Sequence, residues 1–280
     1  MPLPELYENK VLQDEELPIQ ISINWKDTPT EIFSSHWHEH IELHYIIQGT
    51  ADMYLGQQCY PVQQGDLVIA NSSELHSGYC TSAPYTADVI IFDIADLSAE
   101  LAKKNYIFRP MIREDDAIRQ LFHRIFRETE RQEAGYKQLC KALVTELLVY
   151  LSRHYVIQSL PERDSVKRKK NLERLNAVLC YIEQHYTDRI TVGQLAAMAC
   201  LSEDRFGHLF RESVGRPPLQ YINEMRLHKA MNLLRTNQYT VTEVADAVGF
   251  QDYNHFGRQF YRHYGCTPND ARRGKERSKK

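Results

Sequence analysis

Side chains that can bind metal recur at every second position of one short stretch, "HWHEHIELH" over 36–44, where each even position holds a His or a Glu. In an unbroken strand, positions of equal parity point to the same side. Imidazole and carboxylate groups are ligands of Zn, Fe, Mn and Ni. The stretch therefore predicts a metal site, a small-molecule pocket or a solvated strand face, and these residues alone leave the three alternatives open.

The overall composition is typical of a soluble globular protein long enough for two domains, with 280 residues, 42% hydrophobic and 25% charged. No run approaches the ~20 apolar residues of a membrane span, and the first residues lack the features of a signal peptide. The six cysteines include no C-x-x-C pair. This pattern fits a reducing compartment, so we expect a cytoplasmic protein with no membrane partner.

The polar stretch at 36–44 lies in a region with strand patterns. Isoleucines alternate from Ile19 to Ile23, which is the period of a strand. Short runs such as "DLVIAN" and "ADVIIFDI" follow, separated by Gly, Pro and Asn. Residues 19 to about 94 are therefore predicted to form a β-barrel or sandwich.

Between about 114 and 158 the apolar period becomes helical. Two stripes are separated by Gly135: Ile118, Leu121, Phe122, Ile125 and Phe126, then Leu139, Leu143, Val144, Leu147 and Leu151. These helices could pack on the chain's own barrel or against a second subunit, and the pattern favours neither.

A polar segment, "PERDSVKRKKN" (161–171), is predicted to be a linker. It separates a first domain, 1–160, from a second domain, 172–280. Residues 1–170 hold 18 Lys and Arg against 25 Asp and Glu, a net charge of −7, whereas the rest hold 16 against 12, a net charge of +4. The basic second half indicates an anionic partner such as nucleic acid.

The second half contains an internal repeat. "TVGQLAAMACLS" (191–202) matches "TVTEVADAVGFQ" (240–251) at an offset of 49 residues. "RFGHLFRESVG" (205–215) matches "HFGRQFYRHYG" (255–265) at an offset of 50. Each copy has a Thr-x-x-Gln/Glu capping box and then a second capping residue. A short helix, a tight turn and a second helix with buried aromatics are typical of a helix-turn-helix motif.

Between the copies, "PLQYINEMRLHKAMNLLRTN" predicts a long helix that starts at Pro218. A helix over 218–236 would span about 28 Å. Successive major-groove faces of DNA lie roughly 34 Å apart, so this spacer could place the two second helices in neighbouring turns of the groove.

Residues 172–274 resemble the tandem helix-turn-helix domain of AraC-type (AraC/XylS) transcriptional regulators. The resemblance rests on "RLHKAMNLL", "VTEVADAVGFQDYNHFGRQFYRHYG" and "TPNDARR". Tyr261 departs from the family pattern, where a Lys or Arg is usual, which puts one phosphate contact in doubt. The resemblance implies a partner, double-stranded promoter DNA.

Exposed positions on the second helix of each copy are expected to contact DNA. They are Asp204, Arg205, His208, Arg211, Tyr253, Asn254, His255, Arg258 and Arg262. Asn254 suits adenine and Arg258 suits guanine, whereas Arg211 and Arg262 suit phosphate.

The first half resembles the cupin-like sensor domains of the same family, through "HWHEHIELHYIIQG" and "YPVQQGDLVIANSSELH". The resemblance implies a pocket that contains His36, His38, Glu42 and His76. In metal-binding cupins the equivalent residues hold a divalent ion, here Zn, Fe, Mn or Ni. In AraC-type sensors the barrel binds a small organic effector, often a sugar, and a metal could hold that effector.

The expected fold is an α+β multidomain protein, with a cupin-like β-barrel, amphipathic helices and an all-α tandem helix-turn-helix domain. The leading function is an effector-controlled transcriptional regulator and not an enzyme. By resemblance we expect an activator that forms a homodimer through its first domain and contacts RNA polymerase. The alternative is a metal-dependent cupin enzyme with an appended helical domain.

Overall fold

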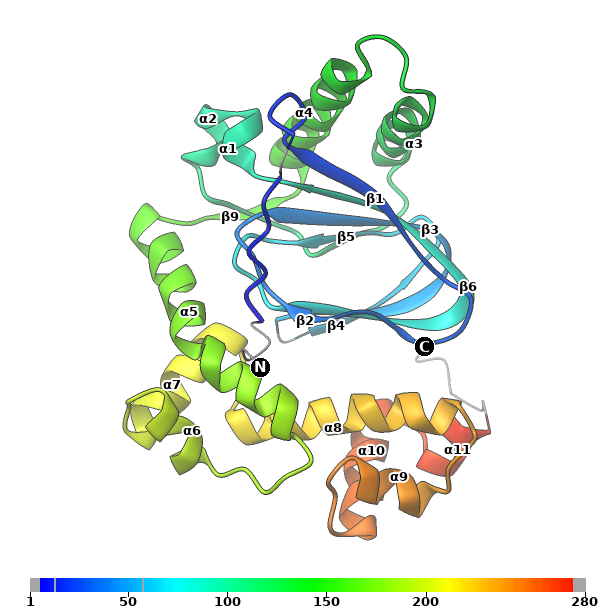
Figure 1. Cartoon of the computed structure of the whole chain (residues 1–280), viewed down its shortest axis with the longest axis vertical. Helices are drawn as coiled ribbons and strands as arrows, with labels where there is room; N and C mark the ends of the chain where they lie inside the picture. Colours follow the sequence, from blue (N-terminus) through cyan, green and yellow to red (C-terminus); the bar gives the residue numbers. More distant parts are fainter. Residues whose placement is uncertain (1–5, 13, 57, 274–280) are drawn as a thin grey trace. The chain divides into compact units, whose positions relative to one another are not determined.

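The computed structural model describes residues 6–12, 14–56 and 58–273. They form two compact units (Figure 1), one over Leu6–Glu173 and the other from Arg174 onward. Among these residues, no helix is long and apolar enough to cross a membrane. The expected fold class is confirmed, because the first unit is rich in antiparallel sheet and the second is helical.

The first unit is built on one seven-stranded antiparallel sheet. Its strands are β1 (Ile19–Lys26), β2 (Glu31–His36), β3 (Ile41–Leu55), β4 (Gln58–Gln63), β5 (Leu67–Ala70), β6 (His76–Phe92) and β8 (Met111–Ile112). The order β1-β6-β3-β5-β8 forms the main path, while β2 pairs with β6 and β4 pairs with β3. The strands β7 (Tyr106–Phe108) and β9 (Val156–Ser159) form a separate pair. Two short helices, α1 (Ile94–Leu97) and α2 (Ala99–Ala102), follow β6.

The long strands β3 and β6 bend together, and this bend lets the sheet curve around its own interior (Figure 1). Their register shifts between Ile46 and Ala51, and such irregularities bend a strand. Gly49 lies at the bend with φ 81°, and a Cβ there would be 2.6 Å from the Pro84 carbonyl oxygen. Only glycine fits this conformation and this close approach. Within the curve, Ile46, Met53 and Ala87 belong to a buried apolar cluster.

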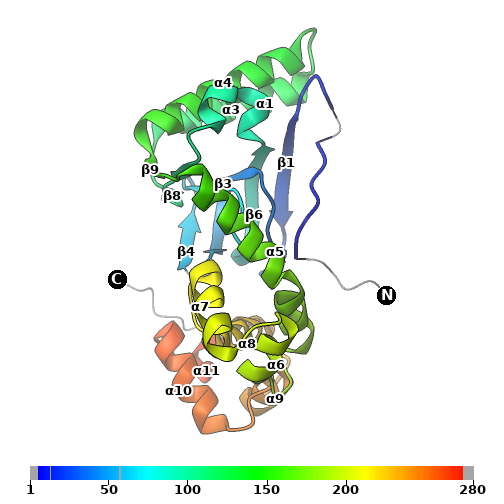
Figure 2. The same cartoon turned by 90° about the vertical axis from the view of Figure 1, so that its left-hand side faces the viewer.

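Two amphipathic helices, α3 (Asp116–Arg131) and α4 (Tyr136–His154), cover the other face of the sheet and pack side by side (Figure 2). The apolar stripe expected for α3 is fully buried. On α4, Leu143, Val144, Leu147 and Leu151 are buried as expected, but Leu139 is 44% exposed. Both helices share one core with Leu43, Ile90 and Phe92 of the sheet. The stripes therefore pack on the chain's own sheet.

The segment expected to be a linker, 161–171, is helical. It forms the first half of α5 (Glu162–His185), and the boundary between the two units falls inside that helix, between Glu173 and Arg174. Lys, Arg and Glu have high helix propensity, and proline is favoured where a helix begins. The polar composition that indicated a linker is also typical of a solvated helix. The position of the segment between the two domains fits a loop and a helix equally well.

The second unit contains both copies of the repeat. Helices α6 (Val192–Met198) and α7 (Glu203–Val214) form the first copy, and α9 (Val241–Ala247) and α10 (Tyr253–Tyr264) form the second. The spacer helix α8 (Pro218–Arg235) joins them, and α11 (Pro268–Arg272) follows (Figure 1). The two copies close their turns with the same backbone hydrogen bond, from Leu201 to Ala196 and from Phe250 to Ala245, each at 2.9 Å. The repeat found in the sequence is therefore a structural repeat.

The predicted capping residues explain where the helices of the repeat begin. Both capping boxes are formed, Thr191 with Gln194 and Thr240 with Glu243. In the second helices, Ser202 accepts a hydrogen bond from the backbone of Arg205, and Asp252 accepts two. These side chains satisfy backbone N–H groups that have no partner inside the helix.

Candidate effector site and nucleic-acid interface

The four expected ligand residues converge inside the first unit. One ligand atom from each of His36, His38, Glu42 and His76 lies within 4.8 Å of the others. Pairing of β2 with β6 places His36 opposite His76. His38, Glu42 and His76 are at most 4% exposed. Around one ion with bonds of about 2.1 Å, ligand atoms would lie roughly 3 to 4 Å apart, so the set is close to the size of a metal site.

In one unbroken strand the even positions of 36–44 would share a face, but the structure has no such strand there. The chain leaves the strand after His36 and re-enters the sheet only at Ile41, so 36–44 is not one continuous strand. Trp37 instead forms a single bridge with Tyr7 and is fully buried. The turn between the strands, and not a shared face, directs His38 toward Glu42.

Glu42 is the centre of the cluster. Its Oε2 lies 2.8 Å from Nε2 of His38 and 3.4 Å from Nε2 of His76, and its Oε1 lies 2.8 Å from Nε2 of His44. Burial alone would raise the pKa of the Glu42 carboxyl, but the three imidazoles outweigh burial and hold that pKa well below its usual range. Burial, followed by the repulsion of His76, lowers the pKa of His36 to about 4. Glu42 is thus ionised and His36 is neutral near pH 7.

Each of the three expected imidazole ligands has its Nδ1 atom at hydrogen-bonding distance from a backbone carbonyl. For His36, His38 and His76 the acceptors are, respectively, Ser34 at 2.9 Å, His40 at 3.2 Å and Glu74 at 2.7 Å. A hydrogen bond donated by Nδ1 fixes the orientation of each ring, and in His38 it presents Nε2 to the Glu42 carboxylate at 2.8 Å. Metal-bound histidines are held in the same way by outer partners.

Further polar groups that the site prediction omitted line the same interior. The His44 ring stacks on Phe33 with centroids 5.0 Å apart. In the part of the chain that the structure describes, the buried hydroxyl of Tyr85 has no hydrogen-bond partner. Buried polar groups are normally paired, so this hydroxyl is an unused donor and acceptor inside the curved sheet. His44 could have been predicted from the sequence, because it lies two positions after Glu42 on the same strand face. No sequence pattern indicated Tyr85.

The residues expected to contact DNA lie on α7 and α10, on the sides opposite the buried phenylalanines. Eight of the nine are exposed: Asp204, Arg205, His208, Arg211, Tyr253, Asn254, Arg258 and Arg262. His255 differs, because it is half-buried. Its Nε2 lies 3.2 Å from Nε2 of Gln259, and its ring lies 6.0 Å from that of Phe250. Contact of His255 with DNA stays a prediction, and its position favours a supporting role on the helix.

Comparison with known proteins agrees with this organisation. Residues 25–148 match the model of the AraC-like ligand binding domain, and residues 195–274 match that of a helix-turn-helix domain. The HTH-type transcriptional activator RhaS of Klebsiella pneumoniae is 26% identical over 263 residues, which cover 89% of this chain and 90% of that protein. An uncharacterized HTH-type transcriptional regulator of Haemophilus influenzae is 28% identical over 233 residues, 83% of this chain and 66% of that protein.

Among solved structures, the DNA-binding domain of AdpA in complex with a target DNA is 32% identical. The match covers 36% of this chain and 90% of that one, with a TM-score of 0.34. The two family models, over 25–148 and 195–274, show that the chain belongs to the AraC-type transcriptional regulators. It is a regulator with a ligand-binding domain, and the enzyme considered as the alternative is set aside.

Proposed function

We propose that this regulator binds a small polar effector, such as a sugar, inside the curved sheet of its first unit. The observation that carries the proposal is the buried cluster of His38, Glu42 and His76, together with the unpaired hydroxyl of Tyr85. An unpaired hydroxyl is costly to bury, and a ligand rich in hydroxyl groups would satisfy it. The surrounding residues 25–148 match a ligand-binding domain.

A panel of monosaccharides and sugar acids would test the effector by isothermal titration calorimetry with the full chain. We expect one member to bind, and the Tyr85→Phe variant to bind it at least 10-fold more weakly. Tyr79→Phe is the matched control, because that hydroxyl is bonded outside the cluster, to the Pro29 carbonyl at 3.3 Å. Equal binding by wild type and Tyr85→Phe would place the effector elsewhere.

We also propose that a divalent ion, Zn, Fe, Mn or Ni, is held by His36, His38, Glu42 and His76. The support is the donor set and the fixed Nδ1 hydrogen bonds of the three histidines. Such an ion would act as a Lewis acid toward effector oxygens. Metal analysis of protein dialysed against each ion should show one equivalent in wild type and in the His123→Ala control, whose side chain is exposed on α3. Retention of the metal by His38→Ala would contradict this proposal.

Specific DNA binding is proposed for α7 and α10. The support is the exposure of eight predicted residues and the structural repeat that places one such helix in each copy. Gel-shift titration of promoter fragments from neighbouring genes would test it at physiological salt. We expect Asn254→Ala and Arg258→Ala to reduce preference for the bound fragment, while Arg131→Ala in the first unit keeps it. Equal affinity of wild type for random DNA would overturn the proposal.

The remaining expectations concern assembly and output. We propose a sensing and dimerisation domain over 1–160 and a DNA-binding domain over 172–280, with activation through RNA polymerase. The homodimer through the first domain is proposed from the resemblance to AraC-type sensors, and Leu139, which is 44% exposed on α4, is the apolar side chain to test. Sedimentation of Leu139→Glu against wild type would test it. A monomeric wild type at micromolar concentration would contradict the dimer.

A further inference from the structure

A carboxylate lies on the face of the sheet that is otherwise an apolar core. On β6, Phe92, Ile90 and Asp88 point to the same side, the side covered by α3 and α4. Phe92 and Ile90 are fully buried in that core, and Asp88 is still only 8% exposed. Asp88 is paired across the strands with Tyr45 of β3, whose ring stacks on Phe122 of α3. An acid thus occupies a position where an apolar side chain would be expected.

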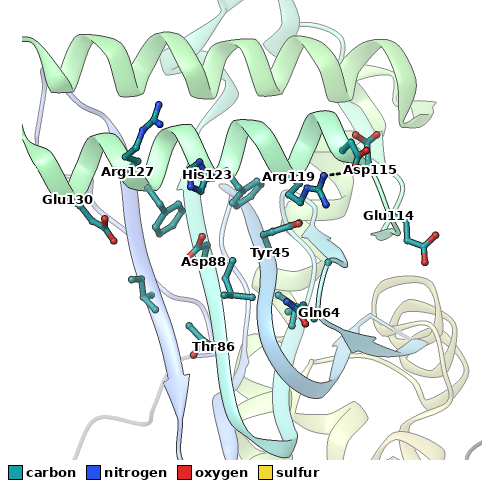
Figure 3. Close-up of a pocket in the computed structure, with 17 residues that line it drawn as sticks. Tyr45, Gln64, Thr86, Asp88, Glu114, Asp115, Arg119, His123, Arg127 and Glu130 are labelled. Atoms are coloured by element: carbon teal, nitrogen blue, oxygen red, sulfur yellow. Dashed lines mark ion pairs between the residues drawn. The ribbon is translucent and has the colours of Figure 1, made fainter.

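Asp88 lies in a pocket of about 940 Å³ between the sheet and α3 (Figure 3). Drug-sized ligands occupy sites of about 300–1,000 Å³. Aromatic rings of Tyr45, Phe122 and Phe126 form part of the wall, and Thr86 lies near Asp88. On β3, Tyr45 has the opposite parity to Glu42 and His44, and Asp88 is the partner of Tyr45 on β6. The pocket is therefore on the other face of the sheet from the histidine cluster.

No side chain neutralises Asp88 among the residues that the structure describes: neither an ion pair nor a hydrogen bond to its carboxylate is formed. Its charged neighbour is Glu130, which has the same sign. Burial and then Glu130 raise the pKa of Asp88 to about 7. Buried carboxylates are normally paired or hydrogen-bonded, whereas the Asp88 carboxylate has no partner among the described side chains and faces the open pocket.

The arginine side chains of α3 do not form an ion pair with the Asp88 carboxylate. Arg119 is paired with Asp116 at 2.8 Å. Arg127 is exposed and points away from the sheet, whereas Glu130 points toward it (Figure 3). The wall beside Asp88 is therefore aromatic, while Arg119, His123 and Arg127 line the pocket from α3.

We propose that this pocket binds a small organic cation, an amine with an apolar or aromatic body. Its ammonium group pairs with Asp88 and is attracted by Glu130 at the mouth. The apolar body packs against Tyr45 and Phe122, whose ring faces also attract cations. The pocket is a second ligand site, separate from the effector site in the sheet interior, and the proposal stands whether or not that effector binds.

Ligand-observed NMR and calorimetry on the full chain would test the site with benzylamine, phenethylamine and putrescine as probes. Benzyl alcohol is the uncharged match for benzylamine. We expect at least one amine to bind below millimolar concentration, benzyl alcohol to bind at least 10-fold more weakly, and Glu130→Gln to lower the amine affinity a few-fold.

Asp88→Asn keeps the size of the side chain and removes its charge, so it should fold and lose at least 10-fold in amine affinity. Asp96→Asn, at an exposed acid of α1, is the matched control and should bind the amine as wild type does. Circular dichroism confirms that each variant is folded. Binding of no amine by wild type, or equal binding by Asp88→Asn, would overturn the proposal.

Discussion

The carboxylate of Glu39 forms an ion pair with Lys169 of α5. Glu39 directly follows His38 of the candidate effector site, and it also accepts a hydrogen bond from the Tyr7 hydroxyl at 3.0 Å. One residue earlier on α5, Arg168 donates from Nε to the Ser73 carbonyl at 3.0 Å. The first half of α5 therefore contacts both loops that position the site histidines, and the same helix continues past Arg174 into the second unit.

Removing the ion pair between Lys169 and Glu39 should destabilise the first half of α5. For Lys169→Ala we expect amides of 162–173 to exchange up to about 5-fold faster in hydrogen-exchange mass spectrometry, since a partly exposed ion pair contributes about 0.2–1 kcal/mol. Lys170→Ala is the matched control because that side chain is exposed on the same helix. Identical exchange in the two variants would show that the ion pair does not hold the helix.

Gly249 in the turn of the second repeat is required by both space and backbone. Its φ is 84°, and a Cβ would lie 2.4 Å from the Thr187 carbonyl oxygen. Gly249→Ala should lower the free energy of unfolding of the second unit by about 2–4 kcal/mol, from left-handed strain and the clash. Gly257→Ala on α10, where a Cβ meets open space, should raise it by about 0.5–1 kcal/mol. Urea unfolding measures both, and equal midpoints for the two variants would refute the assignment.

Asp88 should make the first unit less stable at higher pH. Its folded pKa of about 7 is raised above the ordinary value of 3.8, so the folded state binds the proton more tightly than the unfolded state. The stability that this proton contributes is present below about pH 4 and is lost as the pH rises to about 7.

Asp88→Asn removes this dependence. Between pH 5 and pH 8 we expect wild type to lose about 1–2 kcal/mol relative to the variant, allowing for solvent screening at the open pocket. Denaturant unfolding at both pH values, with Asp96→Asn as the control, measures the difference. If the difference in unfolding free energy between wild type and Asp88→Asn is the same at both pH values, Asp88 has an ordinary pKa.

Base and phosphate contacts on α10 should differ in their dependence on sequence and salt. Arg258→Ala should cost about 1–3 kcal/mol on the preferred site and little on random DNA, as expected for a contact to guanine. Arg262→Ala should weaken binding to all sequences alike and lower the salt slope by about 0.9, as expected for one lost phosphate contact. Fluorescence anisotropy at several salt concentrations separates the two kinds of contact. If Arg258→Ala weakens binding to all sequences and Arg262→Ala only to the preferred site, the assignment of base and phosphate contacts is reversed.

Much of the second unit was determined by the sequence itself, because its signals are local. Capping boxes at Thr191 and Thr240 involve residues three positions apart, and the phenylalanines of α7 and α10 follow the helical period. The linker prediction at 161–171 was different, since a charged segment can be a loop or a solvated helix. The side chains of Lys169 and Arg168 contact loops far away in the sequence, and these contacts favour the helix. The amino-acid sequence of 161–171 does not reveal such contacts.

The candidate sites depended more on tertiary structure. The sequence supplied His36, His38, Glu42 and His76 as ligand types, but the break after His36 and the pairing of β2 with β6 brought them together. Asp88 had no signal at all, because an acid in a strand is usually solvated. Only the packing of α3 over that face of the sheet buries it. Periodicity and capping are set by neighbours along the chain, whereas burial and convergence are set by residues far apart in sequence, and those required the folded structure.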